Sequence, residues 1–466
     1  MRYGRAVLAG AAWWLTAAAP DPGIEAAVRA ALAQAPAGTR FGLVVRDAGG
    51  VERVVIDADQ RFVPASNTKI FTTIAAFANL DIDGPDGART GVWIEGRDVV
   101  LVGTGDARLS SAEDCTSDCL ATLADAVAAR TRVVGDVIGD DSAFPDQRWS
   151  PGMGWNNIVS RYGTGISALT LDDNELALTV GIEGGKAVVS GSDYYRIDNR
   201  VTVGPRTAIA YDRMPGSDLL RVSGTVVPGT SERIRVGIDD PAHHAAWKLA
   251  KVLRSKGVRV TGRVVARHRP YRAAEDGAVV QRGVLPPMLT HTQPEPLRGD
   301  ILVTNKASQN LHAELLLRRV GAVEGSGSIA DGLKKVSAIM TLAGVPRTAW
   351  DLSDGSGMST YNRVTPRAMV ALLGWAQAQP WGAAWLETLP VAGVDGTLAR
   401  RFKGTALEGR LHAKTGSLAG TSALAGTMTA ASGQTLTFAM YANDVPEGSS
   451  ATAAMDAALV AVAAGL

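Results

Sequence analysis

The amino-acid sequence predicts a mixed α/β (α+β) fold, in which helices flank an antiparallel sheet and a large β-rich block interrupts the chain. Three observations lead to this expectation. Helical patterns occupy the parts before residue 84 and after residue 285, short strand-like runs fill the stretch between them, and three further strands precede a last helix. At 466 residues the chain is too long for one ordinary core, so two or three domains are expected.

The part before the β-rich block is expected to hold two helices and two strands. The stretch "IEAAVRAALAQAP" has the apolar spacing of a helix, and "RFGLVVRDAGGVERVVIDAD" reads as two strands around the turn "DAGG". A second helix begins at Ser66, in "FVPASNTKIFTTIAAF", and fades near Asp81.

The β-rich block spans residues 85–284, with runs such as "GVWIEGRDVVLVGTGD" and "NELALTVGIEGGKAVVSG". It contains one clear helix, "PAHHAAWKLAKVLRSKG", with a proline near its start and Gly257 after its end. Beyond it, helices are expected in "NLHAELLLRRVGAV", "IADGLKKVSAIMTLAG" and "TPRAMVALLGWAQAQ". Strands follow in "RLHAKTGSLAG", "SALAGTMTAAS" and "QTLTFAMYAND", and an alanine-rich helix comes last.

Composition and charge place the chain among soluble globular proteins. Apolar residues make up 46% and charged residues 20% of the sequence. The formal net charge is +1, and basic residues cluster only in pairs, so no nucleic-acid partner is expected.

The N-terminus has the layout of a secretory signal peptide. Arg2 and Arg5 precede an apolar run, which ends in small residues before Pro20. The run is short for a membrane crossing, and an N-terminal helix of the fold is the alternative. We therefore expect residues 1–19 to be a signal peptide, and the rest to be exported, periplasmic or beyond, without a transmembrane anchor.

The chain holds only two cysteines, Cys115 and Cys119 in "EDCTSDC". In an oxidising compartment they are expected to form a disulfide. The six histidines are scattered without the spacing of metal ligands, so neither a metal nor a cofactor is expected.

Three short motifs occur in order along the chain. Ser66 and Lys69 form S-x-x-K at a helix start, Ser308 and Asn310 form S-x-N before a helix, and Lys414 opens K-T-G on a predicted strand. Ser66 alone has a simpler interpretation as a helix cap, with Lys69 solvated. Together, the three motifs are the signature of penicillin-recognising serine enzymes.

The spacing of the first motif suits a nucleophile and its base. Residues three apart share one helix face, so Lys69 is expected to reach the hydroxyl of Ser66. A lysine acts as a base only if its pKa falls, through burial or a neighbouring cation, for which Lys414 is the candidate. Ser308 is suited to pass a proton to the leaving amine, and Asn310 to hold Lys69 and the substrate amide.

The third motif is suited to bind substrate along a strand. Lys414 and Thr415 are expected to meet a substrate carboxylate, and Gly416 to leave room for the substrate backbone. The backbone N–H groups of Ser66 and Ser417 are expected to form the oxyanion hole.

The chain resembles the peptidase S13 family of low-molecular-mass (class C) penicillin-binding proteins, which are D-alanyl-D-alanine carboxypeptidases and endopeptidases. The resemblance rests on "PASNTK", "LVGTGDARLS", "GISALTLDDNEL", "NKASQNLHAELLL", "DLSDGSGMSTYNRVTP", "VAGVDGTLARR" and "HAKTGSLAG". It implies a penicillin-recognising, β-lactamase-like transpeptidase domain made of residues 20–84 and 285–466, and two smaller domains within 85–284. Serine at 417, where the family has threonine, is a mild departure.

The resemblance implies an exported serine DD-peptidase that acts on peptidoglycan stem peptides and binds β-lactams covalently. Two alternatives stay open, a serine β-lactamase and a non-catalytic cell-wall-binding protein. The balance of carboxypeptidase and endopeptidase activity and the oligomeric state are also open.

Several residues near the motifs have less definite interpretations. The run Asp354-Gly355-Ser356-Gly357 is interpreted as a structural turn near the cleft. Glu314 and His312, which follow S-x-N, are interpreted as packing or surface residues. Of the aromatic residues Trp149, Trp155 and Tyr162, most are expected in the core and one beside the cleft.

Overall fold

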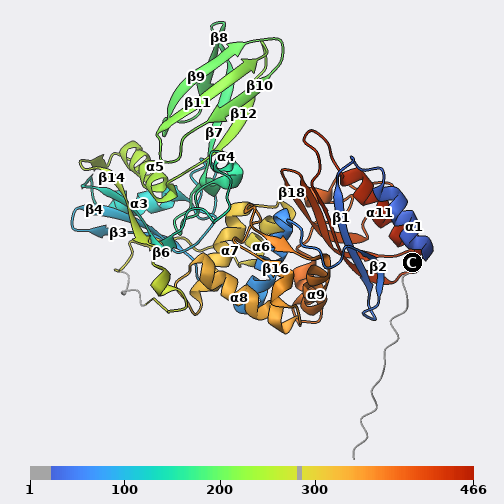
Figure 1. Ribbon diagram of the computed structural model, residues 1–466. Coiled ribbons are helices and arrows are strands. Elements are labelled where there is room, and N and C mark those ends of the chain that lie inside the picture. Colours follow the sequence, from blue (N-terminus) through green and yellow to red (C-terminus); the bar gives the residue numbers. More distant parts are fainter. Residues whose placement is uncertain (1–21, 281–285) are drawn as a thin grey trace, which may run out of the picture.

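The computed structural model describes residues 22–280 and 286–466. Figure 1 shows three parts: the sheet that contains β1, β2 and β18, with helices on both faces, a β-rich part that contains β3, β4 and β6 on the far side of the inner helices, and a third made of long strands. The predicted signal peptide, residues 1–19, lies outside the described residues. Within the described ranges, no helix is long and apolar enough to cross a membrane.

The first sheet joins strands from both ends of the chain. Its strands run antiparallel in the order β18-β19-β20-β1-β2. Their bounds are β1 Arg40–Asp47, β2 Glu52–Ile56, β18 Leu411–Leu418, β19 Thr421–Thr429 and β20 Thr435–Asn443. β1 therefore pairs with β20, which lies almost at the other end of the sequence.

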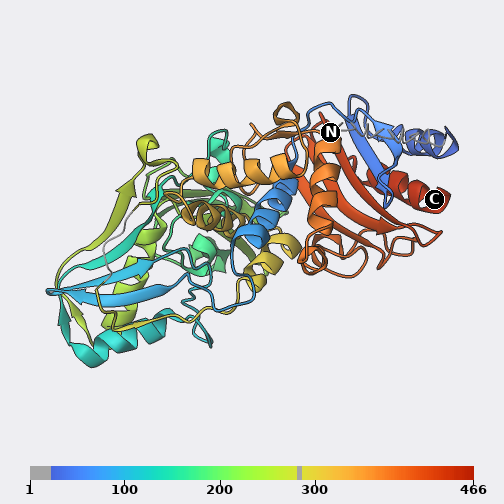
Figure 2. The same cartoon turned by 90° about the horizontal axis from the view of Figure 1, so that it is seen from below.

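Helices bury both faces of this sheet, because side chains alternate along each strand. Leu43 and Val45 of β1 pack with the terminal helices, and Val44 between them packs on the opposite face with the inner helices. The terminal helices are α1 Pro22–Leu32 and α11 Thr452–Gly465. The inner ones are α2 Thr68–Asn79, α6 Arg298–Lys306, α7 Asn310–Ala322, α8 Ile329–Leu342, α9 Pro366–Gln377 and α10 Gly382–Leu386. Figure 2 shows the sheet between the two layers.

The second part is a mixed sheet in the order β14-β6-β4-β3-β15, which packs against helices α3 and α5. β6 pairs in parallel with β4 and β14, and the other pairs are antiparallel. The bounds are β3 Thr90–Glu95, β4 Asp98–Gly103, β6 Val137–Asp146, β14 Val264–Pro270, β15 Thr290–His291, α3 Leu120–Arg130 and α5 Pro241–Ser255. A small parallel pair joins β5 Val133–Val134 and β13 Arg259–Val260.

The third part consists of two three-stranded sheets that share one apolar cluster. Their orders are β12-β7-β8 and β10-β11-β9. The bounds are β7 Glu175–Glu183, β8 Lys186–Ser190, β9 Arg196–Val203, β10 Ala208–Asp212, β11 Leu219–Val226 and β12 Glu232–Gly237. Elsewhere lie the short helix α4 Trp155–Ile158 and the pair β16 Trp350–Asp351 and β17 Arg363–Val364.

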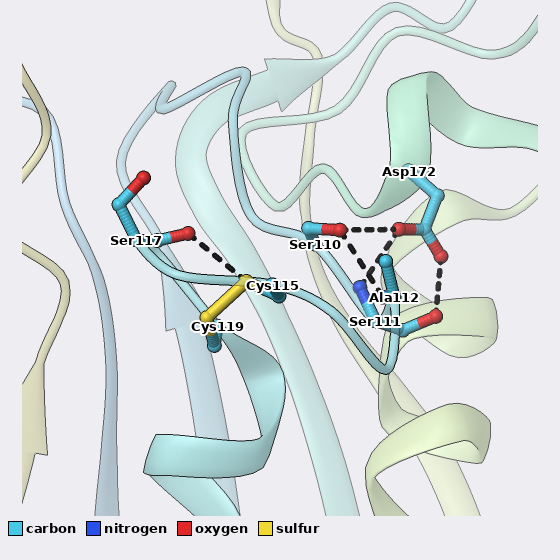
Figure 3. The surroundings of a disulfide bond; sticks show 7 residues. All are labelled: Ser110, Ser111, Ala112, Cys115, Ser117, Cys119 and Asp172. Atoms are coloured by element: carbon cyan, nitrogen blue, oxygen red, sulfur yellow. Dashed lines mark hydrogen bonds between the residues drawn. A yellow bond between two sulfur atoms is a disulfide. The ribbon is translucent and has the colours of Figure 1, made fainter.

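The predicted disulfide between Cys115 and Cys119 is present, with the two Cα atoms 5.8 Å apart. It lies in the loop of residues 110–119, which leads into α3. Figure 3 shows Asp172 at the start of this loop, where its carboxylate accepts hydrogen bonds from Ser110 and Ser111. Asp172 therefore fixes the start of the loop, and the disulfide fixes its end.

Candidate active site

The three motifs meet on the inner side of the first sheet. Ser66 lies in a 3₁₀ turn, Ala65–Asn67, which leads into α2, and Ser308 lies between α6 and α7. Ala65 and Ser308 both have positive φ, 47° and 59°, which is strained for residues with a side chain. Ala65 immediately precedes Ser66, and Ser308 is itself a motif serine, so the strained backbone orients both hydroxyl groups.

Ser66 does not cap the helix. The N-cap residues of the 3₁₀ turn and of α2 are Pro64 and Asn67, and neither end has a side-chain cap. Instead, Ser66 Oγ lies 2.9 Å from the Nζ atom of Lys69. The structure thus favours the nucleophile interpretation over the capping one.

Lys69 is fully buried, and two carbonyl oxygens hold its amine. Nζ donates hydrogen bonds to Asn310 Oδ1 and to the backbone carbonyl of Ser356, both at 2.6 Å. A neutral amine has two N–H bonds and one lone pair. With both N–H bonds engaged, the lone pair is left to face the Ser66 hydroxyl, which is the geometry a general base needs.

Burial lowers the pKa of Lys69 to about 7, although the carboxyl groups of Asp354 and Glu314 act in the opposite direction. Burial, and then repulsion from Lys69, lowers the pKa of Lys414 well below its usual value. The sequence left two causes open for the low pKa of Lys69, burial and the charge of Lys414. In the structure burial is the main cause for both lysines.

Lys414 contacts the second motif rather than the first. Its fully buried Nζ donates to Ser308 Oγ at 2.9 Å and to the carbonyl of Thr415 at 3.0 Å. Lys414 and Ser308 are therefore placed to exchange a proton, separately from the pair of Ser66 and Lys69.

The β-rich block reaches the site through its backbone. Asn310 Nδ2 donates to the carbonyl of Tyr162 at 2.9 Å, which fixes the amide that faces Lys69. The rings of Tyr162 and Trp155 are largely exposed, and Trp149, which donates its indole N–H to Gly163, is half-buried. The expectation that most of these aromatic residues lie in the core is therefore wrong, and Trp149 and Tyr162 both line a small cavity beside Asn310.

The K-T-G motif lies on β18, the edge strand of the first sheet. Thr415 Oγ1 lies 2.7 Å from Thr397 Oγ1, and Ser417 is exposed. A Cβ added to Gly416 would lie 2.7 Å from the carbonyl oxygen of Pro64, in the loop just before Ser66. The glycine is thus required by the protein's own backbone, a reason that the sequence did not suggest.

Sequence reasoning missed two contributors to the site. The Ser356 carbonyl binds Lys69, and Glu314, interpreted as a packing or surface residue, is a buried acceptor of backbone hydrogen bonds beside the site. The run from Asp354 to Gly357 looks like any turn in the sequence, and a backbone carbonyl leaves no signature in the choice of side chain. Within this run, only Gly357 marks the site in the sequence. Its position requires a glycine, because a Cβ would lie 1.9 Å from the carbonyl oxygen of Ala65.

Comparison with known proteins shows the family of the chain. The sequence model of the D-Ala-D-Ala carboxypeptidase 3 (S13) family matches residues 24–465. A D-alanyl-D-alanine carboxypeptidase of Actinomadura sp. is 34% identical over 475 residues, which cover 95% of this chain and 82% of that protein.

Solved structures confirm the predicted penicillin-recognising fold. Penicillin-binding protein 4 of Haemophilus influenzae has a TM-score of 0.78 at 22% identity, and the match covers 93% of this chain and 98% of that one. The same protein in complex with a β-lactam has a TM-score of 0.71 at 20% identity, with the same coverage. From the match to the family model over nearly the whole chain and from the 34% identical relative, it follows that this chain belongs to the D-Ala-D-Ala carboxypeptidase 3 (S13) family of peptidases.

Proposed function

We propose that this chain is an exported serine DD-peptidase that cleaves D-alanyl-D-alanine stem peptides of peptidoglycan through an acyl-enzyme on Ser66. The observation that carries the proposal is the buried Lys69 amine, held by two carbonyls and 2.9 Å from Ser66 Oγ. The substrate class is supported by the relative named a D-alanyl-D-alanine carboxypeptidase and by the β-lactam complex of the structural neighbour.

In the first step, Ser66 Oγ attacks the carbonyl carbon of the penultimate D-alanine while Lys69 takes the hydroxyl proton. The backbone N–H groups of Ser66 and Ser417 stabilise the oxyanion. As the C–N bond breaks, Ser308 gives its proton to the leaving amine and is reprotonated by Lys414, 2.9 Å away. Water then attacks the ester carbonyl and gives its proton through Ser308 to Lys414, while Lys69 returns its proton to Ser66 Oγ as the acyl C–O bond breaks.

Residues 390–392 hydrogen-bond to the first part of the outer edge of β18, at Leu411 and Ala413. Beyond them, at Thr415 and Ser417, this edge is suited to receive the substrate backbone as an added strand. The paired hydroxyls of Thr415 and Thr397 lie at this edge and offer donors to the terminal carboxylate of the substrate. Lys414 is fully buried, so its amine does not lie at this edge to meet the carboxylate, as the sequence suggested. It acts on the substrate through Ser308, to which it donates a hydrogen bond.

The proposal is tested by incubating the purified protein with muropeptides and identifying the products by mass. A carboxypeptidase removes one terminal D-alanine from a pentapeptide, and an endopeptidase splits cross-linked dimers at the D-alanyl bond. Release of either product would support the proposal. Intact muropeptides together with efficient binding to cell walls would favour the non-catalytic alternative.

The acylation rate is expected to rise with pH, with a midpoint near the Lys69 pKa of about 7. Only the neutral amine accepts the Ser66 proton, so the rate falls about tenfold per pH unit below that midpoint. Labelling rates with a fluorescent penicillin, measured from about pH 5.5 to 8.5, check this expectation. A flat profile across this range would contradict the role of Lys69 as the base.

The β-lactamase alternative predicts a different fate for the acyl-enzyme. Class A β-lactamases use a dedicated glutamate to activate the deacylating water, and the sequence has no comparable motif beside S-x-N or K-T-G. The opened lactam keeps its amine tethered and obstructs the water, whereas a peptide loses its D-alanine. We therefore expect penicillin to deacylate many times more slowly than a D-alanyl-D-alanine peptide turns over.

Intact-mass spectra recorded over hours check this expectation. The penicilloyl adduct on the protein should persist throughout the series. Loss of the adduct within seconds, with repeated turnover of penicillin, would favour the β-lactamase function.

A further inference from the structure

A buried carboxyl group close to the base has no part in the reaction described above. Glu314, on α7, accepts hydrogen bonds at Oε1 from the backbone N–H groups of Gly355 and Ser356, both at 2.9 Å. The carbonyl of the same Ser356 accepts the 2.6 Å hydrogen bond from Lys69. The Glu314 side chain is thus hydrogen-bonded to the backbone segment whose carbonyl orients Lys69.

This backbone lies between two carboxyl groups. Glu314 accepts hydrogen bonds from the two backbone N–H groups that precede the Ser356 carbonyl. Asp354 accepts a 3.0 Å hydrogen bond from the N–H of Gly357, which belongs to the same peptide unit as that carbonyl. Thr72 of α2 adds a 2.7 Å hydrogen bond to the carbonyl of Gly355. The Ser356 carbonyl is therefore fixed from both directions.

We propose that Glu314 is a positioning residue for acylation: its Oε1 holds the Gly355 and Ser356 amides, and so aims the Ser356 carbonyl at the Lys69 amine. The inference rests on the roles proposed above for Ser66 and Lys69. If this carbonyl moves, one N–H of the neutral amine loses its acceptor, and the amine rotates. Its lone pair then leaves the Ser66 hydroxyl, so the nucleophile loses its base although every motif residue is still present.

The hydrogen bonds that carry this role need an acceptor atom rather than a charge. Burial, and then the neighbouring Asp354, raises the pKa of Glu314 and so favours its neutral form. Oε2 has no hydrogen-bond partner within the part of the chain that the structure describes. An amide at this position therefore retains the acceptor that faces Gly355 and Ser356.

Two substitutions separate position from charge. Glu314→Gln keeps the length and the acceptor oxygen but cannot ionise. Glu314→Asp can still ionise but shortens the side chain by one methylene group, so its oxygen no longer reaches both amides. A positioning role predicts that glutamine is the better replacement, and an electrostatic role through the charge predicts that aspartate is.

The readout is the maximal acylation rate at saturating fluorescent penicillin, normalised to the fraction of protein that labels. We expect Glu314→Gln to stay within about threefold of the parent rate. We expect Glu314→Asp to be at least about tenfold slower, with noncovalent penicillin affinity nearly unchanged, because small displacements of a catalytic group are costly. An aspartate variant as fast as the glutamine variant, or parental rates in both, would overturn the proposal.

A control on the same helix distinguishes positioning from general damage to α7. Leu315 is buried in a separate cluster with Ala107 and Phe144. Leu315→Ala is expected to lower thermal stability while its labelled fraction acylates at the parent rate. Ser66→Ala tests the nucleophile separately: if it still labels, the proposed function fails, whereas parental rates in both Glu314 variants refute the positioning role alone.

Discussion

Replacing Ser66 with alanine is expected to abolish covalent labelling by a fluorescent penicillin. Among the residues that the structure describes, Ser66 has the only hydroxyl group bonded to the Lys69 amine, and it caps no helix end. Because the loss is one partly exposed hydroxyl, the unfolding free energy should change by only about 0.5 kcal/mol. Gel fluorescence and intact mass after incubation with the penicillin measure the loss.

The matched control is Ser255→Ala on α5, where the hydroxyl only bonds to the backbone carbonyl of Val252. This variant should label like the parent. Covalent labelling that persists in Ser66→Ala would move the nucleophile elsewhere and refute the mechanism.

Replacing Lys69 with arginine is expected to be nearly as damaging, with acylation slowed by about 10²–10⁴-fold, the usual contribution of a general base. Arginine does not give up its proton in a protein, so it cannot take the proton of Ser66. Stopped-flow or quenched labelling gives the rate. A variant within about tenfold of the parent would contradict the assignment.

Arginine is larger and keeps its charge in a site where Lys69 is fully buried, so loss of folding must be separated from loss of the base. Lys69→Met removes the charge at similar length, and it should acylate as poorly as the arginine variant. Lys251→Arg, in an exposed ion pair with Asp193, is the control for the exchange itself and should react normally.

The contact between the proposed nucleophile and its proposed base could be predicted from the sequence, because it depends only on residue type and helical spacing. Ser66 and Lys69 lie three residues apart, and their predicted contact is a property of one helical turn. The sequence predicted Lys414 as a cation near Lys69 and as a partner of the substrate carboxylate, but its contact with Ser308 joins distant segments and was not predicted.

The local sequence pattern does not predict features that depend on backbone conformation or on pairing between distant strands. The sequence predicts that a helix begins at Ser66, but the positive φ of Ala65 produces a 3₁₀ turn there, and α2 begins at Thr68. Strand-like runs in the β-rich block do not reveal their direction, so the parallel pairing of β9 with β11 was not predicted. The block also reaches further than residue 284, since β15 joins its sheet, and the domain boundaries stay a prediction.

The pairing of β1 with β20 has a consequence for biosynthesis. Asn443, the last residue of β20, accepts a hydrogen bond from the N–H of Val63 and donates one to its carbonyl, three residues before Ser66. A nascent chain therefore carries its nucleophile from early in translation but cannot immobilise it until almost the whole sequence has been made. Contacts between such distant segments are slow to form. We therefore expect Ser66, the proposed nucleophile, to be fixed in place only after β20 has been synthesised.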